Sequence, residues 1–217
     1  MNFMKLGNVL IYGDSYSTYE SYIPEGYACY YTPRERSGAP FLPSVENTWW
    51  YPIVTREGNA LVENNSWSGS TVCHTGWHGA DTSKTSSFLC RLEKHIAEGF
   101  FQKKKIDTVF VFGLTNDIWS GAPLGEAKYE NFEEKDLFFV LPAIAYMVKR
   151  LREATPDSRV VWVVNSGVVG PIADVLRESC ARFGADALFL SPFSKEEGHP
   201  TAEGMRAITA QIDAFLG

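Results

Sequence analysis

Five short apolar runs divide the chain, and each is followed by a glycine or a polar residue. The runs are too short for buried helices, and most are rich in β-branched or aromatic side chains. Such runs are typical of strands that are covered on both faces, as in a parallel sheet. The predicted strands are residues 8–13, 60–63, 106–112, 160–164 and 187–190.

Between these runs, apolar residues recur at three- and four-residue intervals, which is the spacing of amphipathic helices. Thr48 and Thr201 have the side chains of N-caps, and Pro171 suits a first helical turn. Strands that alternate with helices indicate a parallel sheet with right-handed crossovers. The predicted helices are residues 49–57, 87–98, 136–154, 171–183 and 201–215.

The composition is that of a globular protein, with 45% hydrophobic and 21% charged residues. The net charge of −6 argues against nucleic acid and anionic membrane surfaces as partners. No apolar run approaches the ~20 residues of a membrane span. Because residues 1–6 leave no room for a signal peptide before the first strand, we expect a cytoplasmic protein.

The four cysteines are far apart in the sequence, at Cys29, Cys73, Cys90 and Cys180. None has a partner at the short spacing of a zinc site, and a histidine next to Cys73 lacks further ligands at a defined spacing. We therefore expect free thiols and no metal.

Small polar residues or a histidine follow several of the predicted strands. Ser15 follows the first strand, Gly69 the second, Asn116 the third and His199 the last. Because the carboxyl ends of parallel strands lie at one edge of the sheet, these residues should converge there. A serine, a distant histidine and neutral hydrogen-bond donors are the parts that nucleophilic catalysis on an acyl group requires.

The four blocks resemble those of the SGNH/GDSL hydrolases, a family of esterases, deacetylases, thioesterases and lysophospholipases. The matching blocks are Gly13-Asp14-Ser15, Asn65-Ser66-Trp67-Ser68-Gly69, Gly113-Leu114-Thr115-Asn116-Asp117, and His199 in Glu197-Gly198-His199-Pro200. They span nearly the whole chain, in the family's order.

The resemblance implies a role for each matching position. Ser15 would be the nucleophile and His199 the base. The oxyanion donors would be the backbone N–H groups of Ser15 and Gly69 and the side-chain amide of Asn116. Asp14 would brace the turn around Ser15.

Two positions depart from the family pattern. Glu196 stands where the family has an aspartate that orients the histidine, and we expect Glu196 to take that role, with Glu197 or a backbone carbonyl as alternatives. Leu114 stands where a small residue or glycine is expected. Either the turn accommodates Leu114, or its side chain narrows the pocket beside Asn116.

Residues 16–47 contain six tyrosines and four prolines without helical or strand periodicity. A loop of this length is usually functional, and its tyrosines either form a platform for a sugar ring or pack the loop against the domain. Residues 48–51, with Trp67, Trp77 and Trp119, suggest an aromatic-lined pocket. Such a pocket favours an acetyl group on a carbohydrate over a lipid chain.

We therefore expect one domain over residues 1–217, a three-layer α/β/α sandwich whose five-stranded parallel sheet has the flavodoxin-like order 2-1-3-4-5. The expected activity is hydrolysis of small acyl esters through an acyl-enzyme, without a metal or organic cofactor. A small-molecule or carbohydrate ester is the expected partner. The alternatives are a catalytically inactive glycan-binding member of the family and a flavodoxin-like protein that binds phosphate or FMN, although FMN gives Asn116 and His199 no role.

Overall fold

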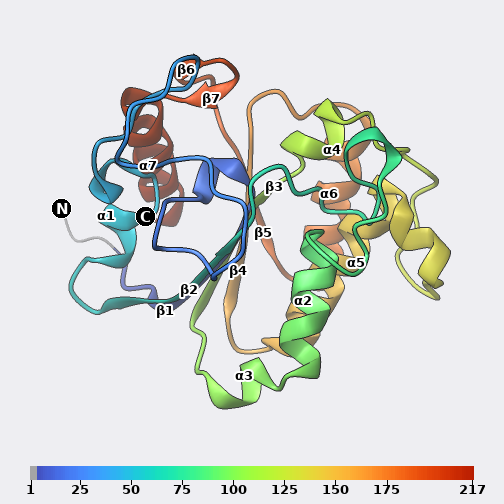
Figure 1. Cartoon of the computed structure of the whole chain (residues 1–217). Coiled ribbons are helices and arrows are strands. Elements are labelled where there is room, and N and C mark those ends of the chain that lie inside the picture. Colours follow the sequence, from blue (N-terminus) through green and yellow to red (C-terminus); the bar gives the residue numbers. More distant parts are fainter. Residues whose placement is uncertain (1–3) are drawn as a thin grey trace.

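The computed structural model describes residues 4–217; residues 1–3, which the predicted domain includes, lie outside the described part. Its central sheet has five parallel strands in the order β2-β1-β3-β4-β5. This order confirms the predicted α/β/α sandwich, and helices cover both faces of the sheet (Figure 1). The strands are β1 (Gly7–Gly13), β2 (Asn59–Ser66), β3 (Thr108–Gly113), β4 (Arg159–Val164) and β5 (Asp186–Phe189).

The central strands are almost wholly apolar because side chains on both of their faces are buried. Leu10, Val109 and Trp162 belong to the hydrophobic cluster on one face. Ile11 and Phe110, the next residues along β1 and β3, belong to the cluster on the other face. The two-residue alternation of a strand therefore divides each central strand between two cores.

Three helices cover the first face and two cover the second (Figure 1). The first set is α2 (Phe88–Ala97), α5 (Val140–Ala154) and α6 (Pro171–Phe183), and the second is α1 (Tyr51–Val54) and α7 (Ala202–Leu216). Short elements complete the described chain: helices α3 (Phe100–Lys103) and α4 (Thr115–Trp119), four 3-10 turns, and the two-stranded pair β6 (Lys195–Glu196) and β7 (His199–Pro200). None of the helices within residues 4–217 has the length and apolar character needed to cross a membrane.

Several element boundaries differ from the predicted ones. The predicted helix 136–154 is a 3-10 turn (Glu134–Phe138) followed by α5, and Pro142 lies in the first turn of α5, where its missing N–H is tolerated. The predicted helix 49–57 shrinks to α1, whose N-cap is Trp50 and not the predicted Thr48. β2 continues to Ser66 because Asn64 and Asn65 pair with β1 despite their polar side chains.

The long segment of residues 16–47 packs as part of a core. Tyr16, Tyr19 and Tyr31 are buried in the cluster that includes α1 and α7. These three tyrosines therefore follow the packing alternative rather than forming a sugar platform. All four cysteines are free, as expected.

Candidate active site

Ser15 lies directly after the carboxyl end of β1, in a 3-10 turn that Asp14 caps. The Asp14 carboxylate accepts a hydrogen bond from the Tyr16 N–H at 3.0 Å, so it braces this turn as expected. Gly13 allows the end of the neighbouring strand β2 to approach closely, since a Cβ on Gly13 would lie 2.4 Å from Ser66 Oγ. The sharp turn places the Ser15 side chain at the edge of the sheet.

His199 reaches Ser15 from a β-hairpin that was not predicted. Glu197 and Gly198 join β6 to β7 with φ values of 46° and 78°, the pattern of a tight hairpin turn. His199 Nε2 lies 3.0 Å from Ser15 Oγ, and His199 Nδ1 lies 3.1 Å from the Glu197 carbonyl oxygen. Because a carbonyl can only accept, Nδ1 carries the ring proton, and the lone pair of Nε2 faces the serine hydroxyl.

The contact to Nδ1 therefore comes from a backbone carbonyl, which is one of the alternatives expected from the sequence, and not from the preferred Glu196 carboxylate. Glu196 pairs with His199 through the backbone of the exposed strand β6, but its carboxylate makes no hydrogen bond or ion pair with residues 4–217. The physical reason is the hairpin turn, which folds the Glu197 carbonyl back toward the imidazole.

Aromatic rings enclose the His199 imidazole. Tyr30 stacks on it with ring centroids 3.7 Å apart and planes 8° from parallel, and Trp119 meets it edge-on at 5.8 Å. Burial lowers the pKa of His199 below its usual value; the Glu197 carbonyl opposes this shift, and the positive charges of Arg36 and Lys195 add to it. The imidazole is therefore neutral at pH 7, as a general base must be.

The three predicted oxyanion donors lie on neighbouring segments. Gly69, with φ of 79°, occupies a turn that the Ser70 N–H closes onto the Trp67 carbonyl at 3.2 Å. Asn116, buried in α4, donates from Nδ2 to the Ser70 carbonyl at 3.1 Å. Among residues 4–217, no acceptor is hydrogen-bonded to the backbone N–H of Ser15 or Gly69, so both groups are free to donate to a bound oxygen.

Asp117 fixes the loop that follows Gly69. Its buried carboxylate accepts hydrogen bonds from the Val72 N–H at 2.9 Å and the Cys73 N–H at 3.2 Å. Burial raises the pKa of Asp117 to about 6, although the backbone hydrogen bonds oppose this rise. The third block is thus joined to the loop that follows the second block.

Leu114 is accommodated by the turn, the first of the two alternatives. It adopts a φ of 79° at the start of α4, and its side chain is fully buried in the core cluster that includes Val72 and Phe88.

The aromatic residues near the site divide between core and surface. Trp49 and Trp50 are fully buried, and their indole N–H groups donate to Ser17, so the expectation that residues 48–51 line a pocket is wrong for these two side chains. Trp67 is half-buried and its ring packs on Tyr27. The exposed pair is Trp77, which donates to the Gly69 carbonyl at 3.1 Å, and Trp119, each about 40% exposed.

Sequence reasoning missed a polar chain that holds the His199 turn. The Tyr16 hydroxyl donates to the Gly198 carbonyl at 2.6 Å, and Asn165 Nδ2 donates to the Tyr16 hydroxyl at 3.3 Å. Lys195 Nζ donates to Asn165 Oδ1 at 2.7 Å. The available signal was the position of Asn165, which directly follows β4 at the same sheet edge as Ser15.

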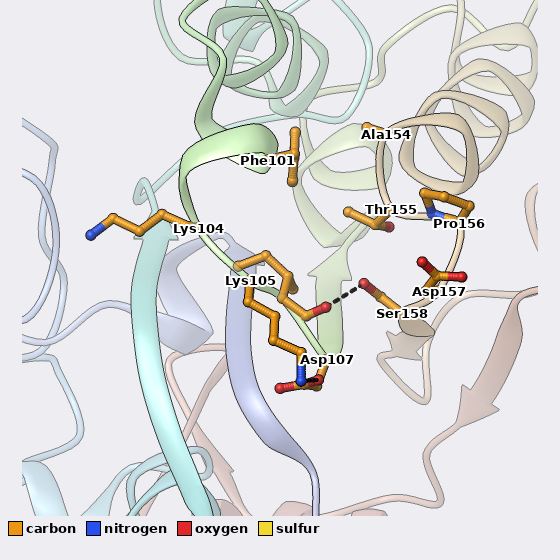
Figure 2. Close-up of a pocket in the computed structure, with 10 residues that line it drawn as sticks. Phe101, Lys104, Lys105, Asp107, Ala154, Thr155, Pro156, Asp157 and Ser158 are labelled. Atoms are coloured by element: carbon orange, nitrogen blue, oxygen red, sulfur yellow. Dashed lines mark hydrogen bonds and ion pairs between the residues drawn. The ribbon is translucent and has the colours of Figure 1, made fainter.

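A pocket at the opposite edge of the sheet contains none of these residues. Figure 2 shows it at the amino ends of β3 and β4, where Asp107, Thr155 and Ser158 line it. The Ser158 hydroxyl donates to the Ile106 carbonyl at 2.8 Å, and this bond joins the segments that directly precede β4 and β3.

Two solved structures are similar to this chain along nearly their whole lengths. A protein from Bacteroides ovatus assigned to the GDSL-like lipases is 34% identical, with a TM-score of 0.87, and the match covers 98% of this chain and 99% of that one. A counterpart from Bacteroides uniformis is 36% identical, with a TM-score of 0.85 and coverage of 95% and 93%.

A third structure, an acetyl xylan esterase from the rumen bacterium Butyrivibrio proteoclasticus, shares the fold at 15% identity. Its TM-score is 0.60, and the match covers 98% of this chain and 64% of that one. A search of curated protein sequences found no match.

The sequence profile of the GDSL-like Lipase/Acylhydrolase family matches residues 7–216. With this match and the two Bacteroides structures, the chain belongs to the GDSL-like lipases and acylhydrolases, and it is a hydrolase that acts on esters.

Proposed function

We propose that this esterase hydrolyses small acyl esters, with acetyl esters of carbohydrates as its substrate class, through an acyl-enzyme on Ser15. One observation carries the proposal: His199 Nε2 lies 3.0 Å from Ser15 Oγ while the Glu197 carbonyl holds the opposite ring nitrogen. This arrangement is that of a nucleophile next to an oriented base.

In the first half-reaction, Ser15 Oγ attacks the ester carbonyl and its proton passes to His199 Nε2. The tetrahedral intermediate carries a negative oxygen, which accepts hydrogen bonds from the N–H groups of Ser15 and Gly69 and from the Asn116 amide. Collapse of the intermediate breaks the bond to the alcohol, which leaves with the proton from His199. The acyl group stays on Ser15.

In the second half-reaction, water attacks the acyl-enzyme and gives a proton to His199. The second tetrahedral intermediate uses the same donors, and its collapse releases the carboxylic acid and returns the proton to Ser15. Throughout, the Glu197 carbonyl accepts from Nδ1–H and keeps the imidazolium in place.

The proposed carbohydrate substrate is supported by Trp77 and Trp119. Trp77 is anchored to the Gly69 carbonyl, and Trp119 to the ring of His199, so two exposed indoles border the proposed oxyanion donor and the base. Aromatic faces suit sugar rings. The acetyl xylan esterase that shares the fold supports the same class of substrate.

The experiment compares hydrolysis of p-nitrophenyl acetate, butyrate and octanoate by the wild type and by Ser15→Ala. We expect the acetate to be preferred, and kcat to fall by at least ~10³ in Ser15→Ala, because the nucleophile is lost. Mass spectrometry after treatment with a fluorophosphonate should find a single adduct, on Ser15. A folded wild type with neither turnover nor adduct would contradict the proposal and favour the glycan-binding alternative.

The carbohydrate part is tested with acetylated xylo-oligosaccharides. Trp77→Ala should raise KM for these substrates and leave KM for p-nitrophenyl acetate unchanged. Tyr22→Ala is the matched control, since Tyr22 is equally exposed but packs against Tyr51 on α1. Equal KM values for the oligosaccharides in wild type and Trp77→Ala would show that Trp77 does not contact the carbohydrate.

A further inference from the structure

Arg91 is a buried arginine without an acidic partner. It lies on α2 and is 1% exposed. No carboxylate among residues 4–217 forms an ion pair with it, and all of its hydrogen bonds go to neutral oxygens. A buried charge without a counter-ion is costly, so such a residue calls for an explanation.

The guanidinium joins three separate segments. Nη2 donates to the Gly13 carbonyl at 3.2 Å and to Ser70 Oγ at 3.1 Å. Nη1 donates to Asn65 Oδ1 at 3.0 Å and also to the Asn65 carbonyl, and Nε donates to the Ser86 carbonyl at 3.0 Å. Every guanidinium nitrogen is therefore used, and the planar fork sets the spacing between the segments.

Two of these segments carry proposed oxyanion donors. Gly13 precedes Ser15 by two residues, and Ser70 directly follows Gly69. The Ser70 carbonyl in turn accepts the hydrogen bond from Asn116 Nδ2 at 3.1 Å. One side chain thus reaches the Ser15, Gly69 and Asn116 segments either directly or through a single further hydrogen bond.

We propose that Arg91 is a positioning residue for the oxyanion hole: its fork fixes the Ser15 and Gly69 segments relative to each other, and through Ser70 it also fixes the position of Asn116. The inference rests on the proposed function. Donors help the reaction only when they point at the place where the negative oxygen forms, and small misplacement is costly in rate. Burial lowers the pKa of Arg91 only to about 10, so the fork stays fully protonated at neutral pH.

The test uses Arg91→Met and Arg91→Lys, with p-nitrophenyl acetate as the substrate. If the fork positions the donors, kcat should fall ~10²-fold in Arg91→Met and at least ~10-fold in Arg91→Lys, with KM within ~3-fold of wild type. Lysine keeps the charge but not the fork. Wild-type kcat in Arg91→Met would overturn the proposal, and so would wild-type kcat in Arg91→Lys, because the charge alone would then suffice.

A double-mutant cycle with Asn116→Ala separates positioning from general damage. If Arg91 acts through the oxyanion donors, the losses in kcat from Arg91→Met and Asn116→Ala should be clearly less than additive. Fully additive losses would overturn the proposal.

Arg152→Met is the matched control, because Arg152 also donates to backbone carbonyls, those of Thr155, Pro156 and Ser158, beside the pocket of Figure 2. It should lower the unfolding temperature and leave kcat unchanged.

Ser70→Ala keeps the proposal testable if Arg91→Met does not fold. It removes one acceptor of the fork and should lower kcat several-fold in the wild-type background. In the Arg91→Lys background, Ser70→Ala should have no further effect on kcat. Wild-type kcat in Ser70→Ala would then overturn the proposal. Activity that is lost in Ser15→Ala but kept in Arg91→Met rejects the role of Arg91 alone. Absence of activity in the wild type rejects the proposed function and this inference with it.

Discussion

At the scale of single residues, His199 has the most unusual surroundings. Its Nδ1 faces a neutral carbonyl rather than a carboxylate, Tyr30 covers one face of the ring, and positive charges lie nearby. A carboxylate partner would raise the pKa of an imidazole, whereas burial and neighbouring cations lower it. The base in this site is therefore tuned toward its neutral form.

This tuning predicts the pH dependence of the esterase. Catalysis needs neutral His199, and the lowered pKa means that the imidazole stays neutral at more acidic pH than usual. The acid limb of kcat/KM should therefore lie below about 6.5, the ordinary value for histidine. A pH–rate profile with p-nitrophenyl acetate measures it, and an acid limb at or above that value would contradict the expectation.

Two variants check which groups set the profile. Arg36→Gln should move the acid limb to higher pH, because it removes one of the charges that lower the pKa of His199. Glu196→Gln should leave the profile unchanged, because its carboxylate does not contact the ring. A large loss of kcat in Glu196→Gln would restore the role that the family pattern implies for this position.

At the scale of elements, the hairpin of β6 and β7 decides where the base lies. Its two-residue turn has positive φ at both positions, and the Tyr16 hydroxyl holds the Gly198 carbonyl. Trp119 packs against this turn, since a Cβ on Gly198 would lie 2.9 Å from Trp119 Cη2. The turn, the aromatic ring and the imidazole are therefore one packed unit.

Gly198→Ala should lower both stability and kcat. The positive φ costs about 1–2 kcal/mol for a residue with a Cβ, and the contact with Trp119 displaces the turn that carries His199. Gly184→Ala is the control: Gly184 has a φ of 77° at the end of α6, with open space around it. Thermal unfolding should show losses in both variants, while kcat should fall only in Gly198→Ala. Unchanged kcat in Gly198→Ala would argue against the turn as the support of His199.

At the scale of the whole molecule, two hydrophobic cores share one sheet. Adjacent residues of β1, β3 and β4 point into opposite clusters, so neither core can lose its strands without exposing the other. Residues 16–47 add to the second core together with α1 and α7. The chain should therefore behave as the single domain that the sequence analysis predicts.

This arrangement predicts one cooperative unfolding transition. Trp162 lies in one cluster and Trp49 and Trp50 in the other, so tryptophan fluorescence reports on both cores. In wild type, the urea midpoint measured by fluorescence should equal the midpoint measured by far-ultraviolet circular dichroism. The two probes should also agree with each other in Trp162→Phe. Separate midpoints would indicate that the two layers unfold independently.

Much of the fold and several contacts of the candidate site were accessible from the sequence. The apolar runs located all five strands of the sheet, and the blocks at their carboxyl ends predicted the approach of His199 to Ser15. The polar end of β2 was missed because pairing with β1 outweighs the weak strand propensity of Asn64 and Asn65. Trp49 and Trp50 were misplaced because a local pattern does not show that Ser17 accepts their N–H groups.

The sequence by itself determined what depends on neighbours in the chain: the apolar runs of the strands, the Thr201 cap of α7, the turn at Gly13 and the order of the blocks. The tertiary structure decided what depends on distant partners. It gave Nδ1 of His199 a carbonyl in place of Glu196, buried Tyr16 and Tyr31, and placed Arg91 between the segments of Ser15 and Gly69. The physical reason is that strand and helix patterns are local, whereas hydrogen bonds and packing between side chains far apart in sequence exist only once the chain has folded.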